Sequence, residues 1–463
     1  MIKKDQIALI SEDEALTYGE MLDLGDVIAK HVEPRSLVFL MTSNTIPAIA
    51  GYVGFERQSA VPLMLREETN LEQLKHLMEA YTPRYIWAKG SYCDEMAETL
   101  GSADVVFENR GYRLLFTGAA KVEIHPETAL LITTSGSTGT PKFVRLTKRN
   151  LKANAESIAE YQCITEHDRA ITTLPFSYSF GISIVNSHLI KGASLALTEH
   201  GILTREFWDF LRLTKATNFG GVPYTYQMLE KLRFERMDLP SLRYIAQAGG
   251  RLGERLQEVF GKLCANKGIE FFVMYGQTEA TARMSWLPPE HVLDKLGSIG
   301  IAIPGGTFEI RDVNDQPIEE AGIAGELVYH GENVSQGYAT CAAELAKPDE
   351  RCGVLHTGDV AKRDEDGYYY IVGRMKRFLK MFGNRVNLDE LEHIFTQRGY
   401  ELACVGHDDH MVIFTTGDDQ EELRQAVAEE TKLYPKAFEV RKIAEIPHTS
   451  SGKIDYQNLE KQC

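Results

Sequence analysis

Short apolar runs alternate with amphipathic stretches along the first 275 or so residues of the chain. Runs typical of buried strands include residues 37–41, 85–88 and 130–133, whereas residues 71–81 and 151–161 have apolar side chains at the spacing of one helix face. Strand and helix in repeated alternation predict a largely parallel sheet that is covered by helices on both faces. We therefore expect an α/β fold.

The pattern changes between residues 297 and 373, where short apolar runs alternate with turns that contain Gly, Asp and Asn. This spacing is typical of antiparallel strands or of a small β-barrel. After residue 373 the sequence becomes basic, and an α+β pattern then begins again. We predict a large N-terminal domain over residues 1–376, whose barrel-like part covers about 297–373, and a small α+β C-terminal domain over residues 377–463.

Composition and charge exclude several classes of protein. The 463 residues include 50 basic and 66 acidic side chains, a formal charge of −16 that is unfavourable for binding nucleic acid or an anionic membrane. No stretch approaches the roughly 18 to 20 apolar residues of a transmembrane helix. The seven cysteines are scattered without a C-x-x-C pair, and no secretion signal precedes them. We expect reduced thiols, a cytoplasmic location, no transmembrane segment and no nucleic-acid partner.

The most specific segment is Thr-Thr-Ser-Gly-Ser-Thr-Gly-Thr-Pro-Lys at residues 133–142, directly after a strand-like run. Its glycines let backbone N–H groups turn inward, its hydroxyls add donors, and its lysine adds positive charge, which together suit triphosphate oxygens. It is not a Walker A loop, because Phe143 follows the lysine where that loop has Ser or Thr. A flexible turn of small residues is the alternative. The candidate phosphate-binding residues are Thr134, Ser135, Gly136, Ser137, Thr138, Gly139 and Lys142.

This loop resembles the signature loop of the adenylate-forming superfamily, which comprises acyl- and aryl-CoA synthetases, nonribosomal-peptide adenylation domains and luciferases. Four further resemblances follow in the order that this superfamily shows: residues 275–279, residues 355–374, residues 380–392 and residues 447–455. The likeness is strongest from residue 130 onward and is closest to the AMP-dependent acyl-CoA synthetases. It implies the α/β fold described above with a mobile C-terminal domain.

The resemblance assigns roles to residues of the second and third segments. It implies that the Tyr275 ring faces adenine, that the Thr278 hydroxyl meets the α-phosphate, and that Glu279 is a Mg²⁺ ligand. Without the resemblance, Tyr-Gly followed by Thr-Glu is more often a helix cap. The likeness further implies that Asp359 accepts hydrogen bonds from the ribose hydroxyls and that Arg374 donates to the ribose or a phosphate.

The C-terminal segments resemble the mobile part of the family. Lys453, near the end of the chain, is implied to bridge the substrate carboxylate and the α-phosphate. Arg377 maps to the hinge, where the family usually has Asp or Lys, and Gly383 maps to the place where a pantetheine arm passes the backbone. A solvated basic linker is the alternative for the lysines of this region.

Residues 175–181 bear on the identity of the acid substrate, because they resemble the family segment that lines the acyl pocket. Tyr178 stands where CoA ligases commonly have His, and the Asp with which amino-acid-activating members hold an ammonium is missing from this segment. An unpaired buried ammonium would be costly, which disfavours an amino acid. Tyr226, Gly249 and Gly250 fall where the family has its pocket walls, although such aromatic residues are as often plain core.

These features predict ATP-dependent, AMP-forming activation of a non-amino carboxylic acid, fatty or aryl, and transfer of its acyl group to CoA. The implied cofactors are ATP, Mg²⁺ and CoA. Three features depart from the family pattern, namely Phe143, Lys148 and a shortened stretch after residue 395. They weaken the assignment of CoA as the thiol acceptor. The alternative acceptor is the phosphopantetheine of a separate acyl carrier protein. A non-catalytic adenylate-sensing protein would not need the retained set of charged site residues, and a luciferase-like oxidase shares the first half-reaction.

Overall fold

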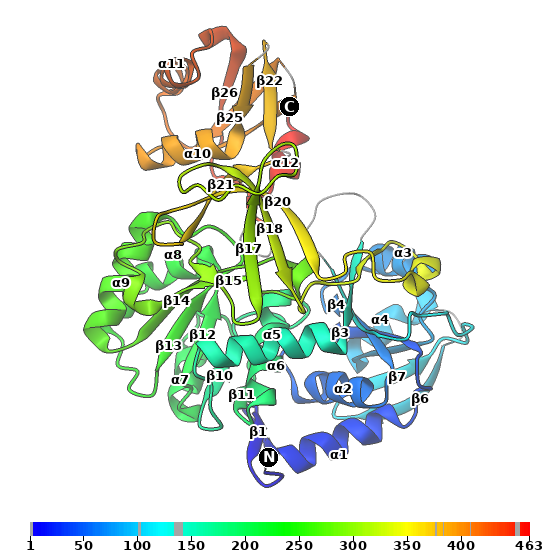
Figure 1. Ribbon diagram of the computed structural model, residues 1–463. Coiled ribbons are helices and arrows are strands. Elements are labelled where there is room, and N and C mark those ends of the chain that lie inside the picture. The colour runs from blue at the N-terminus through cyan, green and yellow to red at the C-terminus, as the bar shows by residue number, and fades with distance from the viewer. Residues whose placement is uncertain are drawn as a thin grey trace. The chain divides into compact units, whose positions relative to one another are not determined.

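The computed structural model describes residues 3–100, 103–133, 142–375, 377–382, 384–407, 409–449 and 454–463 (Figure 1). The chain divides into two compact units. The first unit comprises Met1–Leu296, Ala302–Thr307 and His330–Leu355, and the second comprises Gly297–Ile301, Phe308–Tyr329 and His356–Cys463. The boundary that we predict after residue 376 stays a prediction.

One large sheet of the first unit has, within the described residues, eight strands in the order β19-β9-β8-β4-β3-β5-β7-β6. Its core strands β3, β4, β5 and β8 pair in parallel, and the outer strands pair antiparallel. Every residue of β3 is buried, as expected for a strand that is covered on both faces. The bounds are β3 (Leu37–Thr42), β4 (Val61–Arg66), β5 (Tyr85–Lys89), β6 (Asp104–Asn109), β7 (Tyr112–Phe116), β8 (Thr128–Thr133), β9 (Phe143–Thr147) and β19 (Gly337–Ala339).

The second large sheet has the strand order β16-β15-β14-β13-β12-β10-β11-β1-β2 across the described residues. Its strands from β1 through β11, β10, β12 and β13 to β14 pair in parallel. The bounds are β1 (Ile7–Ile10), β2 (Ala15–Thr17), β10 (Arg169–Ile171), β11 (Ser194–Ala196), β12 (Asn218–Gly221), β13 (Tyr244–Gln247), β14 (Glu270–Tyr275), β15 (Ser285–Leu287) and β16 (Ile301–Ala302). The predicted α/β fold is confirmed.

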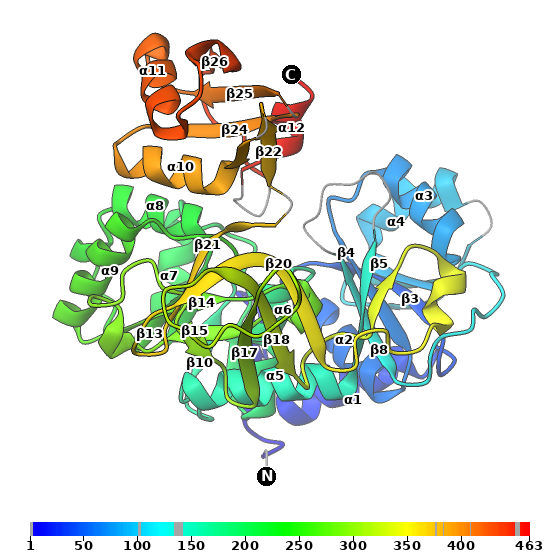
Figure 2. The ribbon, with the colours of Figure 1, turned by 45° about the horizontal axis from the view of Figure 1, so that its top comes forward.

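Helices pack against these sheets in the first unit, as Figures 1 and 2 show. They are α1 (Tyr18–Ala29), α2 (Ile46–Arg57), α3 (Leu71–Tyr81), α4 (Gly90–Leu100), α5 (Lys148–Tyr161), α6 (Ser179–Ile190), α7 (Arg205–Thr214), α8 (Pro223–Lys231) and α9 (Glu254–Lys267), with the 3₁₀ turns η1 (Phe234–Arg236), η2 (Thr278–Ala280), η3 (Pro289–His291) and η4 (Ala342–Ala346). Helix α5 follows β9 without a loop, because Thr147 and Asn150 form a reciprocal capping box at its first turn.

In the second unit, the region that we predict as barrel-like contains a sheet in the order β17-β18-β20-β21. Closure of this sheet into a barrel stays a prediction. The part that follows has the predicted α+β character, with a hairpin of β22 and β23, a sheet in the order β24-β25-β26, the helices α10 and α11 in one apolar cluster, and α12 in a second cluster. The bounds are β17 (Gly306–Arg311), β18 (Gly325–Gly331), β20 (Val354–Arg363), β21 (Tyr369–Arg374), β22 (Phe378–Met381), β23 (Asn384–Asn387), α10 (Leu388–Gln397), β24 (Leu402–His407), β25 (His410–Thr415), α11 (Gln420–Thr431), η5 (Pro435–Ala437), β26 (Phe438–Lys442) and α12 (Tyr456–Glu460).

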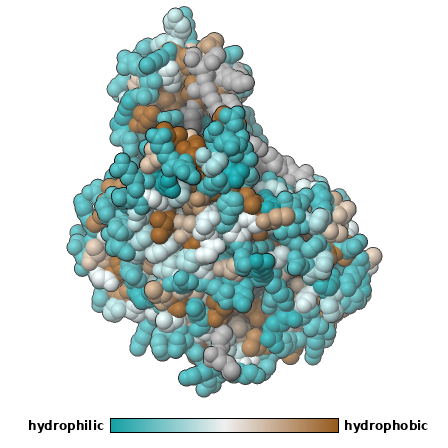
Figure 3. Space-filling model, in the orientation of Figure 1, coloured by the Kyte–Doolittle hydropathy of each residue, from teal (hydrophilic) through white to brown (hydrophobic). Residues whose placement is uncertain are grey.

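Hydrophilic side chains cover most of the face that Figure 3 shows. The most exposed large apolar residues, Val313 at 93% and Leu213 at 78%, lie far apart in the sequence, and single exposed apolar side chains are normal. In the part of the chain that the structure describes, no helix has the length and apolarity to cross a membrane.

Candidate active site

The predicted site residues of the first unit follow strands of the parallel sheet. Tyr178 comes after β10, Gly249 and Gly250 after β13, and Thr278 and Glu279 after β14. The carboxyl ends of parallel strands meet at one edge of a sheet, where ligands of open α/β proteins bind. The topology therefore places these residues along a single edge.

A sharp turn fixes Glu279 directly after β14. A Cβ atom on Gly276 would lie 1.6 Å from the carbonyl oxygen of Ala282, so that only glycine permits this close approach. The chain just before β19 holds the turn from the other side. Asn333 Nδ2 donates to the Ala280 carbonyl over 2.9 Å, and the Ser335 N–H donates to the Glu279 carbonyl over 2.9 Å.

The Glu279 carboxylate is oriented by Tyr338 on β19. The Tyr338 hydroxyl donates to Glu279 Oε1 over 2.5 Å. Burial of the phenol, together with the adjacent Glu279 charge, raises the pKa of Tyr338 well above its usual range. The phenol therefore stays protonated and remains a donor at neutral pH.

Two cations lie on the Tyr338 ring. Strand β19 pairs with β9 so that Tyr338 is opposite Val144, which places Lys142 at a diagonal position on the same face. The Lys142 Nζ is 3.9 Å from the Tyr338 ring centroid, and the guanidinium carbon of Arg351 is 4.7 Å from it. This arrangement suits a polyanion, since positive charge gathers beside a fixed carboxylate.

The donor set around Glu279 suits a Mg²⁺ ion that binds together with a nucleotide. Mg²⁺ is usually bound by one or two carboxylates together with substrate phosphates and water, and its protein ligands are seldom a dedicated cage. The described residues contain no group of three or more His, Cys, Asp or Glu that would form such a cage. Glu279, oriented by a neutral phenol and flanked by cations that attract phosphate, fits a Mg²⁺ that arrives with a nucleotide.

The predicted acyl-pocket residues are partly brought together. The Thr278 hydroxyl donates to Ser179 Oγ over 3.1 Å, at the N-terminus of α6 and next to Tyr178. A Cβ on Gly249, whose φ is +84°, would lie 2.5 Å from the Tyr178 hydroxyl oxygen. Glycine at this position therefore makes room for the Tyr178 ring itself. Gly250 lies against Pro223, at the start of α8, where an added Cβ would meet Cγ at 3.1 Å.

Two further aromatic residues of the predicted site are Tyr226 and Tyr275. Tyr226 is fully buried and packs edge-on against Phe260 and beside Phe271, with ring centroids 5.0 Å and 5.4 Å away. These are contacts of the apolar core. Tyr275 ends β14, and its hydroxyl accepts a hydrogen bond from Gln277 Nε2 over 3.3 Å.

In the second unit, the register of β20 and β21 sets Asp359 opposite Arg374. Arg374 Nε donates to Asp359 Oδ1 over 3.1 Å. The Asp359 side chain is 5% exposed and that of Arg374 is 59% exposed, so that the arginine holds a nearly buried carboxylate and still meets solvent.

Arg377 is held by side chains that follow it in sequence. Its guanidinium donates to Glu392 Oε1 over 2.8 Å, to the Cys404 carbonyl over 2.8 Å and to Asp389, and it lies 3.7 Å from the centre of the Tyr456 ring. The Tyr456 hydroxyl donates to Glu392 Oε2 over 2.8 Å. Arg377 is thus anchored in the packing of α10, β24 and α12.

Several predicted residues lie outside the described residues. They are Thr134, Ser135, Gly136, Ser137, Thr138, Gly139, Gly383 and Lys453. Their assigned roles rest on the sequence alone.

The family model described as AMP-binding enzyme matches residues 2–339. The chain belongs to this family. The predicted membership of the adenylate-forming superfamily is thereby confirmed.

Relatives and solved structures agree with the family. A probable CoA ligase of Humulus lupulus is 30% identical over 353 residues, which are 71% of this chain and 65% of that protein, so the match spans less than two thirds of the relative. The oxalate–CoA ligase of Arabidopsis thaliana is 27% identical over 95% of this chain and 92% of its own length. The structure of o-succinylbenzoate CoA synthetase from Bacillus subtilis has a TM-score of 0.77 at 21% identity and covers 98% of this chain and 95% of that chain.

Two cavities of this chain are lined by residues other than the predicted site residues. A hollow of 850 Å³ in the first unit is lined by Arg35, Glu127, Lys148 and Arg149 among others. Its cations already have partners, since Lys148 pairs with Glu56 and Arg149 with Glu332.

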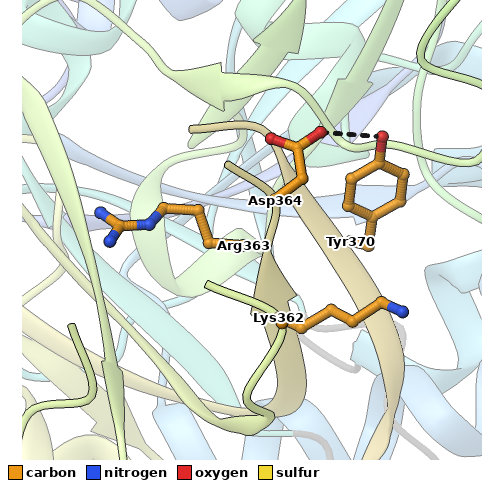
Figure 4. A pocket seen from close by; sticks show the side chains of 5 residues that line it. Lys362, Arg363, Asp364 and Tyr370 are labelled. Atoms are coloured by element: carbon orange, nitrogen blue, oxygen red, sulfur yellow. Dashed lines mark hydrogen bonds between the residues drawn. The ribbon is translucent and has the colours of Figure 1, made fainter. Parts of the chain in front are cut away.

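The other cavity, of 260 Å³, lies where β20 and β21 turn in the second unit (Figure 4). The Tyr370 hydroxyl donates to Asp364 over 3.3 Å, while Lys362 and Arg363 point to opposite sides of their strand. These contacts stabilise a turn.

Three residues of interest were not predicted from the sequence, namely Tyr338, Arg351 and Arg283. Tyr338 follows Gln336-Gly337 after a turn, which is a weak signal without the strand pairing that brings it to Glu279. Arg351 stands in a loop, and nothing in its sequence surroundings distinguishes it from other surface arginines. Arg283 is marked in retrospect by its place four residues after Glu279, in an otherwise apolar run.

Proposed function

We propose that this chain reacts a non-amino carboxylic acid with ATP to form an acyl-adenylate and pyrophosphate, and then transfers the acyl group to the thiol of CoA with release of AMP. The chain is an AMP-forming acid–thiol ligase. The observation that carries this proposal is the cluster of Glu279, Tyr338, Lys142 and Arg351, which joins one oriented carboxylate to two cations.

The chemistry requires positive charge. A carboxylate is a poor acyl donor because its leaving group would be an oxide, and adenylation gives it a phosphate leaving group. The attacking anion must approach the phosphorus of a polyanion, so cations have to draw charge from the phosphate oxygens. Lys142 and Arg351 supply two of them, and Lys453 bridges the substrate carboxylate and the α-phosphate. Mg²⁺, when bound at Glu279, would neutralise further phosphate charge.

The family resemblance assigns nucleotide contacts to residues of each unit. In the first unit, residues 134–139 contact the phosphates, the Thr278 hydroxyl meets the α-phosphate, and the Tyr275 ring faces adenine. In the second unit, Asp359 accepts from the ribose hydroxyls. Arg374 Nε donates to Oδ1 of this carboxylate over 3.1 Å and so helps to orient it.

The acceptor is CoA in this proposal. The relatives named above as CoA ligases support it, and Gly383 provides the place where the pantetheine arm passes the backbone. The C-terminal domain would turn about the position of Arg377 between the two half-reactions. A separate acyl carrier protein, whose phosphopantetheine has the same arm, is the alternative acceptor.

The test is ATP–pyrophosphate exchange with a panel of fatty and aryl acids, repeated with CoA and mass detection of the thioester. We expect exchange with one class of acid, and a thioester with CoA. Lys453→Ala should abolish exchange while it leaves thioester formation from supplied acyl-adenylate largely intact. Equal loss of both activities would contradict the role of Lys453. Exchange without a CoA thioester would assign the carrier protein as acceptor, and no exchange with any acid would refute the ligase.

A further inference from the structure

A buried arginine without a carboxylate partner lies beside the predicted acyl-pocket segment. Arg283 is 1% exposed. Its Nη1 donates to the Tyr161 hydroxyl over 3.3 Å and to Met274 Sδ, and its Nη2 donates to the Ser183 hydroxyl over 3.2 Å. Its Nε has no hydrogen-bond partner.

Every group that contacts this guanidinium is neutral. The Phe180 ring covers it, with the guanidinium carbon 4.2 Å from the ring centroid. No Asp or Glu of the described residues forms an ion pair with Arg283, whereas the other fully buried arginine, Arg145, pairs with Glu350 over 2.9 Å. Arginine remains protonated in proteins, and a buried charge without a counter-charge is strongly destabilising.

The position of Arg283 is fixed by its backbone. Its carbonyl accepts from Asn154 Nδ2 over 2.9 Å and from Asn333 Nδ2 over 3.0 Å. The side chain contacts Tyr161 of α5, Met274 of β14 and Ser183 of α6. Helices α5 and α6 lie side by side in Figures 1 and 2. A charge that the fold holds this firmly, at an energetic cost, calls for an anionic ligand.

Helix α6 relates Arg283 to the reacting end of the acid. Ser179 begins α6 and contacts Thr278, whereas Ser183 lies four residues further along the helix and contacts Arg283. One helical turn rises about 5.4 Å. Arg283 therefore lies roughly one helical turn along α6 from Thr278, next to Phe180, whose ring edge meets the Gly220 position in β12.

The charge of Arg283 also acts on the predicted pocket residue Tyr178. Burial raises the pKa of Tyr178, and the positive charge of Arg283 opposes that rise. The two side chains are thus close enough to interact electrostatically.

We propose that the acid substrate carries a second acidic group, and that Arg283 pairs with this group while the other carboxylate reacts at Thr278. This inference rests on the proposed function and specifies its substrate class, an aliphatic or aryl dicarboxylic acid or an equivalent acid. An arginine holds a carboxylate with two parallel hydrogen bonds, for which Nε and an Nη atom would both be used. Phe180 is the side chain that such a carboxylate displaces from the guanidinium.

The experiment compares matched acids in ATP–pyrophosphate exchange. The dicarboxylates are malonate, succinate, glutarate, adipate and phthalate, and the matched monocarboxylates are propionate, butyrate, pentanoate, hexanoate and benzoate. For the wild type we expect kcat/KM for at least one dicarboxylate to exceed that of its counterpart about 100-fold, because a site built for a polar group strongly rejects the analogue that lacks it. Arg283→Met should lower kcat/KM for the dicarboxylate about 100-fold more than for the monocarboxylate.

Two further variants make the test specific. Arg212→Gln, on an exposed arginine of α7, changes the net charge equally and should retain the preference. Arg283→Lys keeps the positive charge and loses the forked geometry of the guanidinium. It should retain about a tenth of the wild-type preference for the dicarboxylate over the monocarboxylate. The dicarboxylate should also raise the melting temperature of the wild type and leave that of Arg283→Met unchanged. If Arg283→Met does not fold, Arg283→Lys and the ranking of acids by the wild type decide the matter.

The outcomes separate this inference from the proposed function. Exchange in which monocarboxylates equal or surpass dicarboxylates, or a preference that survives in Arg283→Met, would overturn the role of Arg283 and leave the ligase standing. No exchange with any acid would remove the ligase and this inference together.

Discussion

The hydroxyl of Tyr338 donates to Oε1 of Glu279 over 2.5 Å, although the two residues are 59 positions apart in the sequence. The contact exists because β19 pairs with β9, which also brings Lys142 to the same tyrosine ring. One short edge strand thus links two of the segments on which the family resemblance rests.

Tyr338→Phe removes this hydrogen bond and keeps the ring on which both cations lie. We expect the Mg²⁺ concentration for half-maximal exchange to rise about 10-fold, because the partner of a metal-binding carboxylate orients it. Tyr81→Phe is the matched control, since the Tyr81 hydroxyl donates to the backbone of Ala339 on the same strand over 2.8 Å. An equal change in both variants would show that only the packing of β19 is affected.

Lys142→Met removes the cation that lies on Tyr338. We expect kcat/KM for ATP to fall about 100-fold, in the range found for loss of one group that stabilises developing charge. Lys152→Met, on a lysine that is 67% exposed in α5, changes the net charge equally and should leave steady-state kinetics unaffected. Unchanged kinetics in Lys142→Met would show that the lysine does not meet the phosphates.

Glu392→Gln should destabilise the second unit. Burial raises the pKa of Glu392, and Arg377 opposes that rise, which makes the carboxylate the counter-charge of a largely buried arginine. Removal of one partner from such a pair costs about 3 kcal/mol or more, measured as a lower urea midpoint of the C-terminal transition. Glu439→Gln, which breaks the more exposed pair with Arg441, should not shift the midpoint measurably. Equal shifts in both variants would contradict the anchoring of Arg377.

His188 predicts a dependence of stability on pH. Burial lowers the pKa of His188 from its ordinary value of 6.5 to about 4, and the ring accepts from Asn218 Nδ2 over 3.1 Å and bonds the Ile184 carbonyl over 2.9 Å. The unfolded chain therefore takes up the proton first as the pH falls. This contribution to stability is complete above pH 6.5 and is lost between pH 6.5 and 4, by about 3 kcal/mol at most.

Urea unfolding at a series of pH values checks this expectation. His188→Gln should unfold with a weaker pH dependence over that window, whereas His167→Gln, on a side chain that is 88% exposed, should follow the wild type. Parallel curves for all three proteins would show that His188 does not titrate as its surroundings indicate.

The sequence was sufficient where local pattern carries the information. The apolar run of β3 and the glycine before Thr278 and Glu279 mark a buried strand and a sharp turn, and the structure has both. Gly249, which the resemblance places in a wall of the acyl pocket, lies against the Tyr178 hydroxyl, and its role in the pocket stays a prediction.

Contacts between distant strands and the balance of buried charge could not be predicted. Tyr338 meets Glu279 only through the register of β19 on β9, which no local pattern encodes. Arg283 is distinguished by what surrounds it, namely hydroxyls, a thioether and an aromatic ring. Such surroundings are assembled from α5, α6 and β14 and are visible only after folding.

The anchoring of Arg377 separates the role of a hinge residue's side chain from that of the backbone torsions about which a domain turns. Because α10, β24 and α12 all hold its guanidinium, a rotation of the C-terminal segment would carry this side chain along as part of the rotating body. The torsional freedom would then reside in the backbone on its N-terminal side. The side chain of Arg377 would then determine how rigid the rotating body is. The angle of rotation would be determined by the backbone that precedes it.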